Sequence, residues 1–130
     1  MIELRIDTLS GLPAYLQIVR QVKDALRLGL LAPGDQMPTI RELVASLAIN
    51  PNTVLKAYRE LEREGLVGGR PGLGTFVLRT LPGAMQSDLE EMRIGLVRWL
   101  KRAREHGLDE ESIVALFTTT LRQHQREVAA

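Results

Sequence analysis

A row of polar and basic side chains recurs at helical spacing in the middle of the chain. Its members are Asn52, Lys56, Arg59 and Arg63. At about 100° per residue, these four fall on one side of a helix. The opposite side carries Val54, Ala57, Tyr58 and Leu61. An Asn amide can hydrogen-bond a base edge in the DNA major groove, and Lys and Arg can hold phosphates or guanine. The spacing therefore predicts a helix with a buried apolar side and an outer side that suits nucleic acid.

A charged outer side is also what any solvated surface helix shows. Glu60, Glu62 and Glu64 lie on the same helix, so the row alone does not separate DNA contact from ordinary exposure. The turn before this helix and the hairpin after it favour DNA contact, because a solvated helix needs neither. The first residues of a recognition helix enter the major groove deepest. We therefore expect Asn52 and Thr53 to read bases.

The two helices around this turn have clear start signals. Asn50 is a strong N-cap and Pro51 suits the first helical position, while Gly65 suits the C-terminal end. The shorter helix before it starts at the capping box of Thr39 and runs to about Leu47.

Arg41 lies in the first turn of the shorter helix, where free N–H groups also favour a phosphate. The alternative is an exposed Arg41 paired with Glu42 or Asp35.

Further elements complete the N-terminal part. Alternation of Ile2, Leu4 and Ile6 with charged residues predicts a short strand, and a helical pattern follows from Pro13 to Leu30, ended by Pro33-Gly34. Residues 66–67 and 74–78 predict two strands joined by a hairpin loop over 68–73. Three helices and a hairpin in this order predict a winged helix-turn-helix domain over residues 1–80.

Arg70 and Gly72 lie in the expected wing, where a glycine lets the backbone approach DNA closely. An ordinary turn is the alternative, and the loop alone favours it.

The remaining residues, 81–130, predict two helices that cannot bury their own apolar faces. Leu81-Pro82-Gly83 marks the boundary, Ser87 to Glu90 is a second capping box, and Asp109 caps the last helix after Gly107. Two apolar stripes follow helical spacing: Ala103 extends the first of them, and His124 and Val128 extend the second. We expect dimerisation through Leu89, Met92, Leu96, Trp99, Val114, Phe117 and Leu121. The alternative is a hairpin folded back on its own winged domain, which gives a monomer.

Composition narrows the function classes. The 130 residues include no cysteine, which excludes disulfides, thiolate nucleophiles and cysteine-bound zinc. We expect a cytoplasmic protein, because no signal peptide or membrane span is apparent. We also expect no cofactor, metal or catalytic residue. His106 is expected to act as a cation at a helix end, and His124 as an interface residue. A small-molecule effector is neither indicated nor excluded, and a winged helix used only for protein contact is the rival to DNA binding.

An ordered set of motifs resembles the GntR transcription regulators. The match spans about residues 8–78, through Pro13–Ile18, Leu31–Asp35, Met37–Leu43, Asn50–Val54, Ala57-Tyr58, Leu61-Glu62, Glu64–Leu66 and Gly72–Val77. Thr39 stands where serine is common, and Leu55 where other branches often place a basic residue, which leaves Lys56 as the candidate for that contact.

The short C-terminal part is similar to the YtrA subfamily, whose tails serve dimerisation. The resemblance implies DNA contacts at Arg41, Asn50, Asn52 and Thr53, with Gly72 at the wing tip. It further implies a repressor of its own operon, often one that encodes an ABC transporter. In the expected homodimer, a two-fold axis relates two recognition helices, which predicts an inverted-repeat operator.

Overall fold

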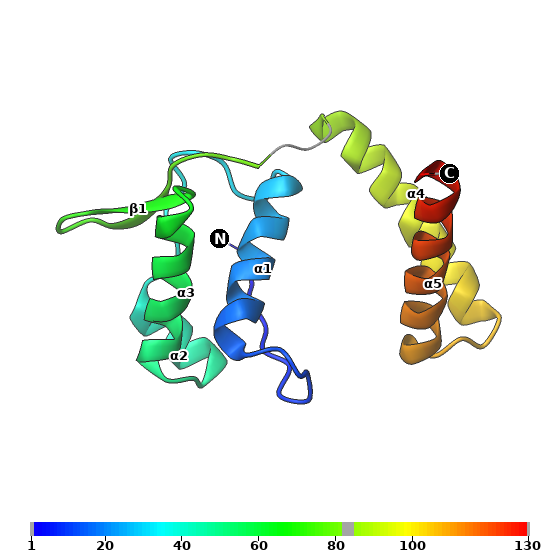
Figure 1. Ribbon diagram of the computed structural model, residues 1–130, viewed down its shortest axis with the longest axis horizontal. Coiled ribbons are helices and arrows are strands. Elements are labelled where there is room, and N and C mark those ends of the chain that lie inside the picture. The colour runs from blue at the N-terminus through cyan, green and yellow to red at the C-terminus, as the bar shows by residue number, and fades with distance from the viewer. Residues whose placement is uncertain (1, 82–84, 130) are drawn as a thin grey trace. The chain divides into compact units, whose positions relative to one another are not determined.

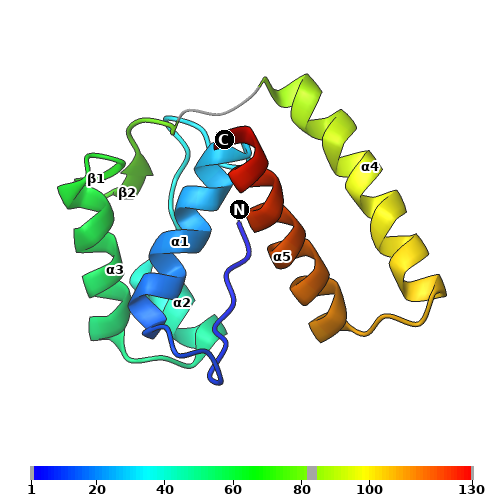
Figure 2. The ribbon, with the colours of Figure 1, turned by 45° about the vertical axis from the view of Figure 1, so that its right-hand side comes forward.

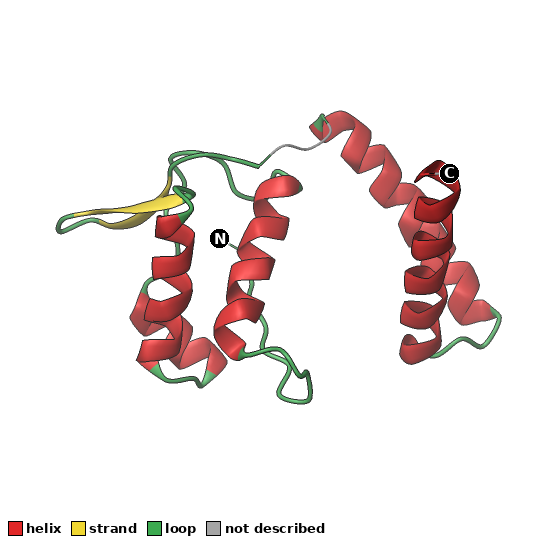
Figure 3. Ribbon diagram, in the orientation of Figure 1, coloured by secondary structure: helices red, strands yellow, loops and turns green. Residues whose placement is uncertain are grey.

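The computed structural model describes residues 2–81 and 85–129. Its contacts divide the chain into two compact units, Met1–Gln86 and Ser87–Ala130. Figure 1 shows the elements in order, and Figure 3 distinguishes helices from strands. They are α1 (Ala14–Arg27), α2 (Ile40–Leu47), α3 (Pro51–Arg63), β1 (Val67–Arg70), β2 (Gly74–Val77), α4 (Gln86–Glu105) and α5 (Glu110–Ala129). The expected boundary at Leu81-Pro82-Gly83 lies, apart from Leu81, outside the described residues, and it stays a prediction.

The first unit is a winged helix, as the sequence predicts. Helix α1 packs along α3, α2 crosses α3, and the β1–β2 hairpin follows α3. The side of α3 expected to face inward is buried: Val54, Ala57, Tyr58 and Leu61 are at most 4% exposed. Full burial of one such aliphatic side chain stabilises the fold by about 1.5–3 kcal/mol. This burial fixes which side of α3 remains outside.

Helix α1 ends earlier than the sequence pattern predicts. The helix stops at Arg27, and Leu30, which we expected on its apolar side, is 67% exposed. Gly29 has φ +73°, and the Leu30 N–H donates to the Ala25 carbonyl at 2.8 Å. This is the Schellman ending, in which a left-handed glycine turns the chain away from the helix. The helix therefore ends before Pro33-Gly34 is reached.

The predicted N-terminal strand is wrong, although its apolar side is placed as expected. Leu4 is buried, and Ile2 and Ile6 pack against the core. No strand lies beside this segment in the described part of the chain. Glutamine side chains of α1 bond its backbone instead: Gln21 Oε1 accepts from the Arg5 N–H at 2.8 Å, and Gln21 Nε2 donates to the Arg5 carbonyl at 2.6 Å. These side-chain amides supply the hydrogen bonds that a neighbouring strand would otherwise give to the backbone of this segment.

The wing differs from the prediction in where its strands end. Residues 68–70 belong to β1, and Val67 pairs with Val77 while Arg70 pairs with Gly74. Pairing with β2 extends the strand through Gly68 and Gly69, so the loop shrinks to residues 71–73. Glycine lowers strand propensity, but the cross-strand ladder overrides that preference here.

The second unit consists of α4 and α5, joined by the turn at Gly107 (Figure 2). Ser87 is not the cap that we expected, because α4 already begins at Gln86. Asp109 does cap α5, since its Oδ1 accepts the Ser112 N–H at 2.8 Å. Hydrogen bonding from Ser112, by its side chain and then by this backbone N–H, lowers the pKa of Asp109 below its usual value. None of the helices in residues 2–81 and 85–129 is long and apolar enough to cross a membrane.

Candidate nucleic-acid interface

The N-terminal end of α3 presents the predicted polar residues outward. Asn50, Asn52, Lys56 and Arg59 are exposed, and Thr53 is half-buried. Asn50 is the N-cap, and its Oδ1 accepts the Asn52 N–H at 2.8 Å. This bond satisfies one of the free N–H groups of the first turn and orients the start of the helix. Asn50 therefore has a structural role beside the DNA contact expected of it.

Replacement of Asn50 by alanine is expected to lower the free energy of unfolding by about 1 kcal/mol, because the cap is lost. Thermal or denaturant unfolding of the free protein measures this change. The matched control is Asn50→Asp, which puts a carboxylate oxygen in place of the amide oxygen at the cap and should unfold like the parent. Equal stability of the parent and Asn50→Ala would remove the capping role.

Lys56 and Arg63, two cations of the outer row, have partners within the protein. The Lys56 ammonium lies 4.1 Å from the centre of the Tyr15 ring on α1, a cation–π contact. Arg63 forms a bidentate ion pair with Glu60, whose pKa is lowered mainly by that hydrogen bond. Lys56 is thus held on α3 beside α1, whereas the charge of Arg63 is offset by a neighbouring carboxylate.

The start of α2 is capped as the sequence predicts. Thr39 Oγ1 accepts the Glu42 N–H at 3.1 Å and also lies 3.1 Å from Glu42 Oε1. Arg41 is exposed in the first turn, and no ion pair joins it to Glu42 or Asp35 among the described residues. Arg41 is therefore an exposed cation in the first turn of α2.

A buried tyrosine joins the middle of α3 to the segment just before α2. The Tyr58 hydroxyl donates to the Pro38 carbonyl at 2.5 Å, so α3 is bonded to the residue just before the α2 cap. Burial, and then the nearby Glu42 carboxylate, raise the pKa of Tyr58 above its usual value. The phenol therefore stays protonated and keeps this bond at neutral pH. Sequence periodicity placed Tyr58 in the core but did not reveal its hydroxyl partner.

The wing presents its predicted residues at the surface. Arg70 and Gly72 are exposed, and the Arg70 guanidinium lies 4.4 Å from the centre of the Phe76 ring. Stacking on Phe76 holds Arg70 along the hairpin and reduces its freedom. Gly72 has φ +74° at the turn. The N-terminal starts of α2 and α3 and the wing together present amides and cations. These are the groups that can contact base edges in a DNA groove and its phosphates.

Known proteins share this arrangement. Residues 14–77 match the family "Bacterial regulatory proteins, gntR family". The HTH-type transcriptional regulator Rv1152 of Mycobacterium tuberculosis is 41% identical over 99 residues, which cover 75% of this chain and 81% of that protein. This chain belongs to the GntR family. It is a DNA-binding transcription regulator and not an enzyme.

Further relatives of this GntR regulator agree with that assignment. The HTH-type transcriptional repressor YtrA of Bacillus subtilis is 46% identical over 74 residues, and that alignment covers 57% of each protein. A crystal structure of AraR(DBD) in complex with operator ORX1 superposes with a TM-score of 0.52 at 29% identity. That superposition covers 59% of this chain and 99% of the AraR chain.

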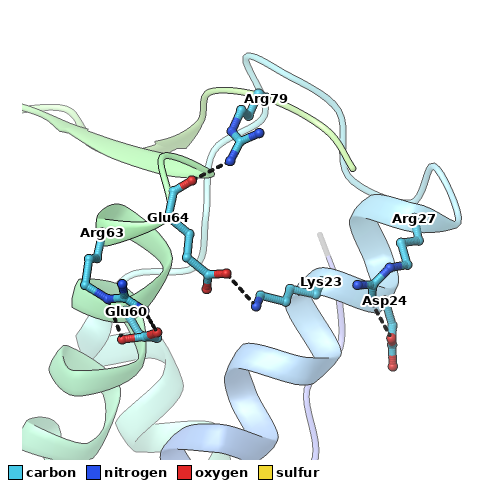
Figure 4. A network of polar contacts seen from close by, with 7 residues as sticks. All are labelled: Lys23, Asp24, Arg27, Glu60, Arg63, Glu64 and Arg79. Atoms are coloured by element: carbon cyan, nitrogen blue, oxygen red, sulfur yellow. Dashed lines mark hydrogen bonds and ion pairs between the residues drawn. The ribbon is translucent and has the colours of Figure 1, made fainter. Parts of the chain in front are cut away.

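A polar network at the far end of α3 was not predicted from the sequence (Figure 4). Lys23 Nζ of α1 lies 2.8 Å from Glu64 Oε1, and Arg79 Nη2 donates to the Glu64 carbonyl at 2.6 Å. Thr80 Oγ1 also donates to the Leu26 carbonyl at 3.1 Å. These bonds join α1, the end of α3 and the chain after β2, so they brace α3 from the end opposite Asn50.

The second unit of this regulator carries a largely apolar groove of about 430 Å³ between α4 and α5. It brings together four of the predicted dimerisation residues. They are Leu96, Trp99, Phe117 and Leu121. Leu89, Met92 and Val114 do not line it.

The sequence stripes missed other members of this unit. Leu116 and Thr120 complete the groove, together with His124, which we expected at the interface. Ile113, which lies outside the predicted stripes, is buried, and Ala103, which belongs to the first stripe, is buried as that stripe predicts. His106 lies beyond α4 with Nδ1 2.9 Å from the Arg102 carbonyl. No group of three or more His, Asp or Glu side chains suited to a metal ion occurs in the part of the chain that the structure describes.

Proposed function

We propose that this GntR regulator binds an inverted-repeat operator as a homodimer and represses transcription from it in the cytoplasm. The observation that carries the proposal is the joint exposure of polar groups at the starts of α2 and α3 and in the wing. The proposed contact residues are Thr39, Arg41, Asn50, Asn52, Thr53, Lys56, Arg59, Arg70 and Gly72.

The position of each residue in the fold suggests which part of the DNA it contacts. Asn52 and Thr53, in the first turn of α3, are proposed to read base edges in the major groove. Arg41, at the start of α2, and Lys56, on the outer side of α3, are proposed to hold phosphates. Arg70 and Gly72 bring the wing against the DNA. The complex of AraR(DBD) with operator DNA supports operator binding by this fold.

The homodimer is supported by the second unit. Phe117 is 49% exposed and Leu121 is 46% exposed on α5, and both line the apolar groove. Exposed apolar patches of this kind mark association surfaces, and a second copy offers an identical one. A two-fold axis would place two α3 helices on half-sites whose centres are about 34–36 Å apart, or a multiple of that. The similarity to YtrA of Bacillus subtilis, a transcriptional repressor, supports repression as the outcome.

Selection of bound fragments from the source genome, followed by footprinting, is the direct test of the operator. A symmetric footprint over two inverted half-sites would support the proposal. Binding without sequence preference, or protection of a single half-site at saturation, would contradict it.

Salt dependence tests the phosphate role of Lys56. Lys56→Ala is expected to weaken specific and non-specific duplex binding alike, and to reduce the slope of log affinity against log salt by about 1. The matched control is Arg27→Ala, which also removes one exposed cation. Arg27 lies at the C-terminal end of α1, whereas Tyr15 lies near its N-terminal end. Its slope should equal that of the parent. A defect of Lys56→Ala confined to the operator would contradict a phosphate contact.

A further inference from the structure

The segment just before α2 pairs with β2 of the wing through an isolated antiparallel bridge. The Met37 N–H donates to the Thr75 carbonyl at 2.8 Å, and the Val77 N–H donates to the Asp35 carbonyl at 2.8 Å. Gln36 and Phe76 form an antiparallel bridge. A lone two-stranded hairpin is marginally stable in water, so this third partner fixes the base of the wing to the first unit.

One side chain carries this support out to the wing tip. Gln36 Nε2 donates to the Leu73 carbonyl at 3.0 Å, in the turn that joins β1 to β2. Gly74, the next residue, has φ +121°, and a Cβ placed on it would lie only 2.9 Å from the same Nε2. The Gln36 amide therefore lies directly against the backbone of the tip, over a position that has no side chain.

The tip has little other support. Pro71, Gly72 and Leu73 are exposed, and the Leu73 N–H donates to the Arg70 carbonyl within the same turn. The base pairs to residues 34–37, but the only side-chain hydrogen bond from outside the hairpin to the 71–73 turn, among the described residues, comes from Gln36. The angle of the tip to the rest of the domain thus depends on Gln36.

We propose that Gln36 is a positioning residue for DNA binding, which sets the place of the wing tip and so the contacts of Arg70 and Gly72. The inference rests on the proposed function, because it needs the wing to touch DNA. Gln36 itself acts through the Leu73 carbonyl and not through the DNA. Its removal is expected to leave the core intact, since the side chain is exposed.

The test compares full-length parent and Gln36→Met, which keeps the length of the side chain but lacks the donor. Hydrogen exchange of the free protein should be about two- to tenfold faster at the wing-tip amides, the range expected for the loss of one hydrogen bond. Operator affinity should fall by a similar factor, and hydroxyl-radical protection of the DNA should weaken at the wing but not at α3. The control is Gln123→Met, an exposed glutamine of α5 without a side-chain bond among the described residues.

A double substitution separates positioning from a direct contact. In an Arg70→Ala background, Gln36→Met should lower affinity little further, because both changes act through the wing. Additive losses would overturn the positioning role. Unchanged exchange in Gln36→Met would overturn it as well while leaving the proposed operator binding intact. Faster exchange with unchanged affinity and footprint would overturn the inference and remove the wing from the DNA contacts. Failure of the parent to bind any duplex would instead reject the proposed function itself.

Discussion

Replacement of both Phe117 and Leu121 by glutamate is expected to give a folded monomer of 14.5 kDa that binds operator on the order of a hundredfold more weakly. Both side chains are about half exposed in the single chain, so their loss removes little of its own packing. In a dimer they would be covered, and an unpaired carboxylate buried at an interface costs several kcal/mol. The affinity falls because, in a dimer, a subunit bound to one half-site holds the second subunit close to the other half-site. A monomer lacks this increase in effective concentration.

Sedimentation and operator titration of the same samples measure both effects. Thr119→Glu is the matched control, since Thr119 is exposed on α5 and lies about 160–200° around the helix from Leu121 and Phe117. It should sediment and bind like the parent. Charged replacements of Leu96 and Trp99 should also abolish the dimer, but Trp99 is half-buried, so that variant also perturbs the hairpin itself. A parent protein that sediments as a monomer at micromolar concentration and still binds operator tightly would contradict both the dimer and the inverted repeat.

Helix α3 was predictable because its signals are local. Asn50 and Pro51 mark its start, Gly65 marks its end, and helical spacing separates its buried side from its outer side. Helix α1 was harder, because Leu28 and Leu30 continue the apolar pattern beyond the actual end. Gly29 was the local signal for that end, since a left-handed glycine terminates a helix more reliably than an apolar spacing extends it.

The N-terminal segment shows a limit of periodicity. Alternation correctly predicted that Leu4 faces inward, but a strand also needs a backbone partner, and the sequence does not say which groups supply one. Gln17 and Gln21 supply it here, through side-chain amides that bond the backbone of Asp7 and Arg5. Glutamines on a helix are usually exposed to solvent, so their spacing in the sequence does not indicate a backbone partner. The packed structure assigns them this role.

The candidate site was predictable in position but not in its internal contacts. Helical geometry placed Asn52, Lys56 and Arg59 outside, and the structure agrees. Pairing of Arg63 with Glu60 follows an i,i+3 spacing and was visible in the sequence. The contact of Lys56 with Tyr15 was not, because it joins helices that are distant in the chain and depends on how they pack.

Substitutions at the starts of α2 and α3 are expected to weaken DNA binding. Asn52→Ala and Arg41→Ala are each expected to leave the unfolding transition unchanged, because both side chains are exposed and neither is a cap. Loss of the base contact of Asn52 should reduce discrimination for operator by about 1–3 kcal/mol, while non-specific binding changes little. Loss of Arg41 should weaken operator and random duplex together, because a phosphate contact carries no sequence information.

Titration against operator and random duplex at several salt concentrations separates these two patterns. Glu62→Ala is the matched control, since it removes an exposed side chain of α3 that is not a proposed contact and should bind at least as tightly as the parent. The difference between the two variants matters as much as the size of either loss. Each phosphate contact steepens the fall of affinity with salt, and an uncharged amide does not. Arg41→Ala should therefore flatten the slope, while Asn52→Ala leaves it unchanged. If both variants bind operator like the parent, the DNA is read by a different surface, and the exposed row on α3 is an ordinary solvated side.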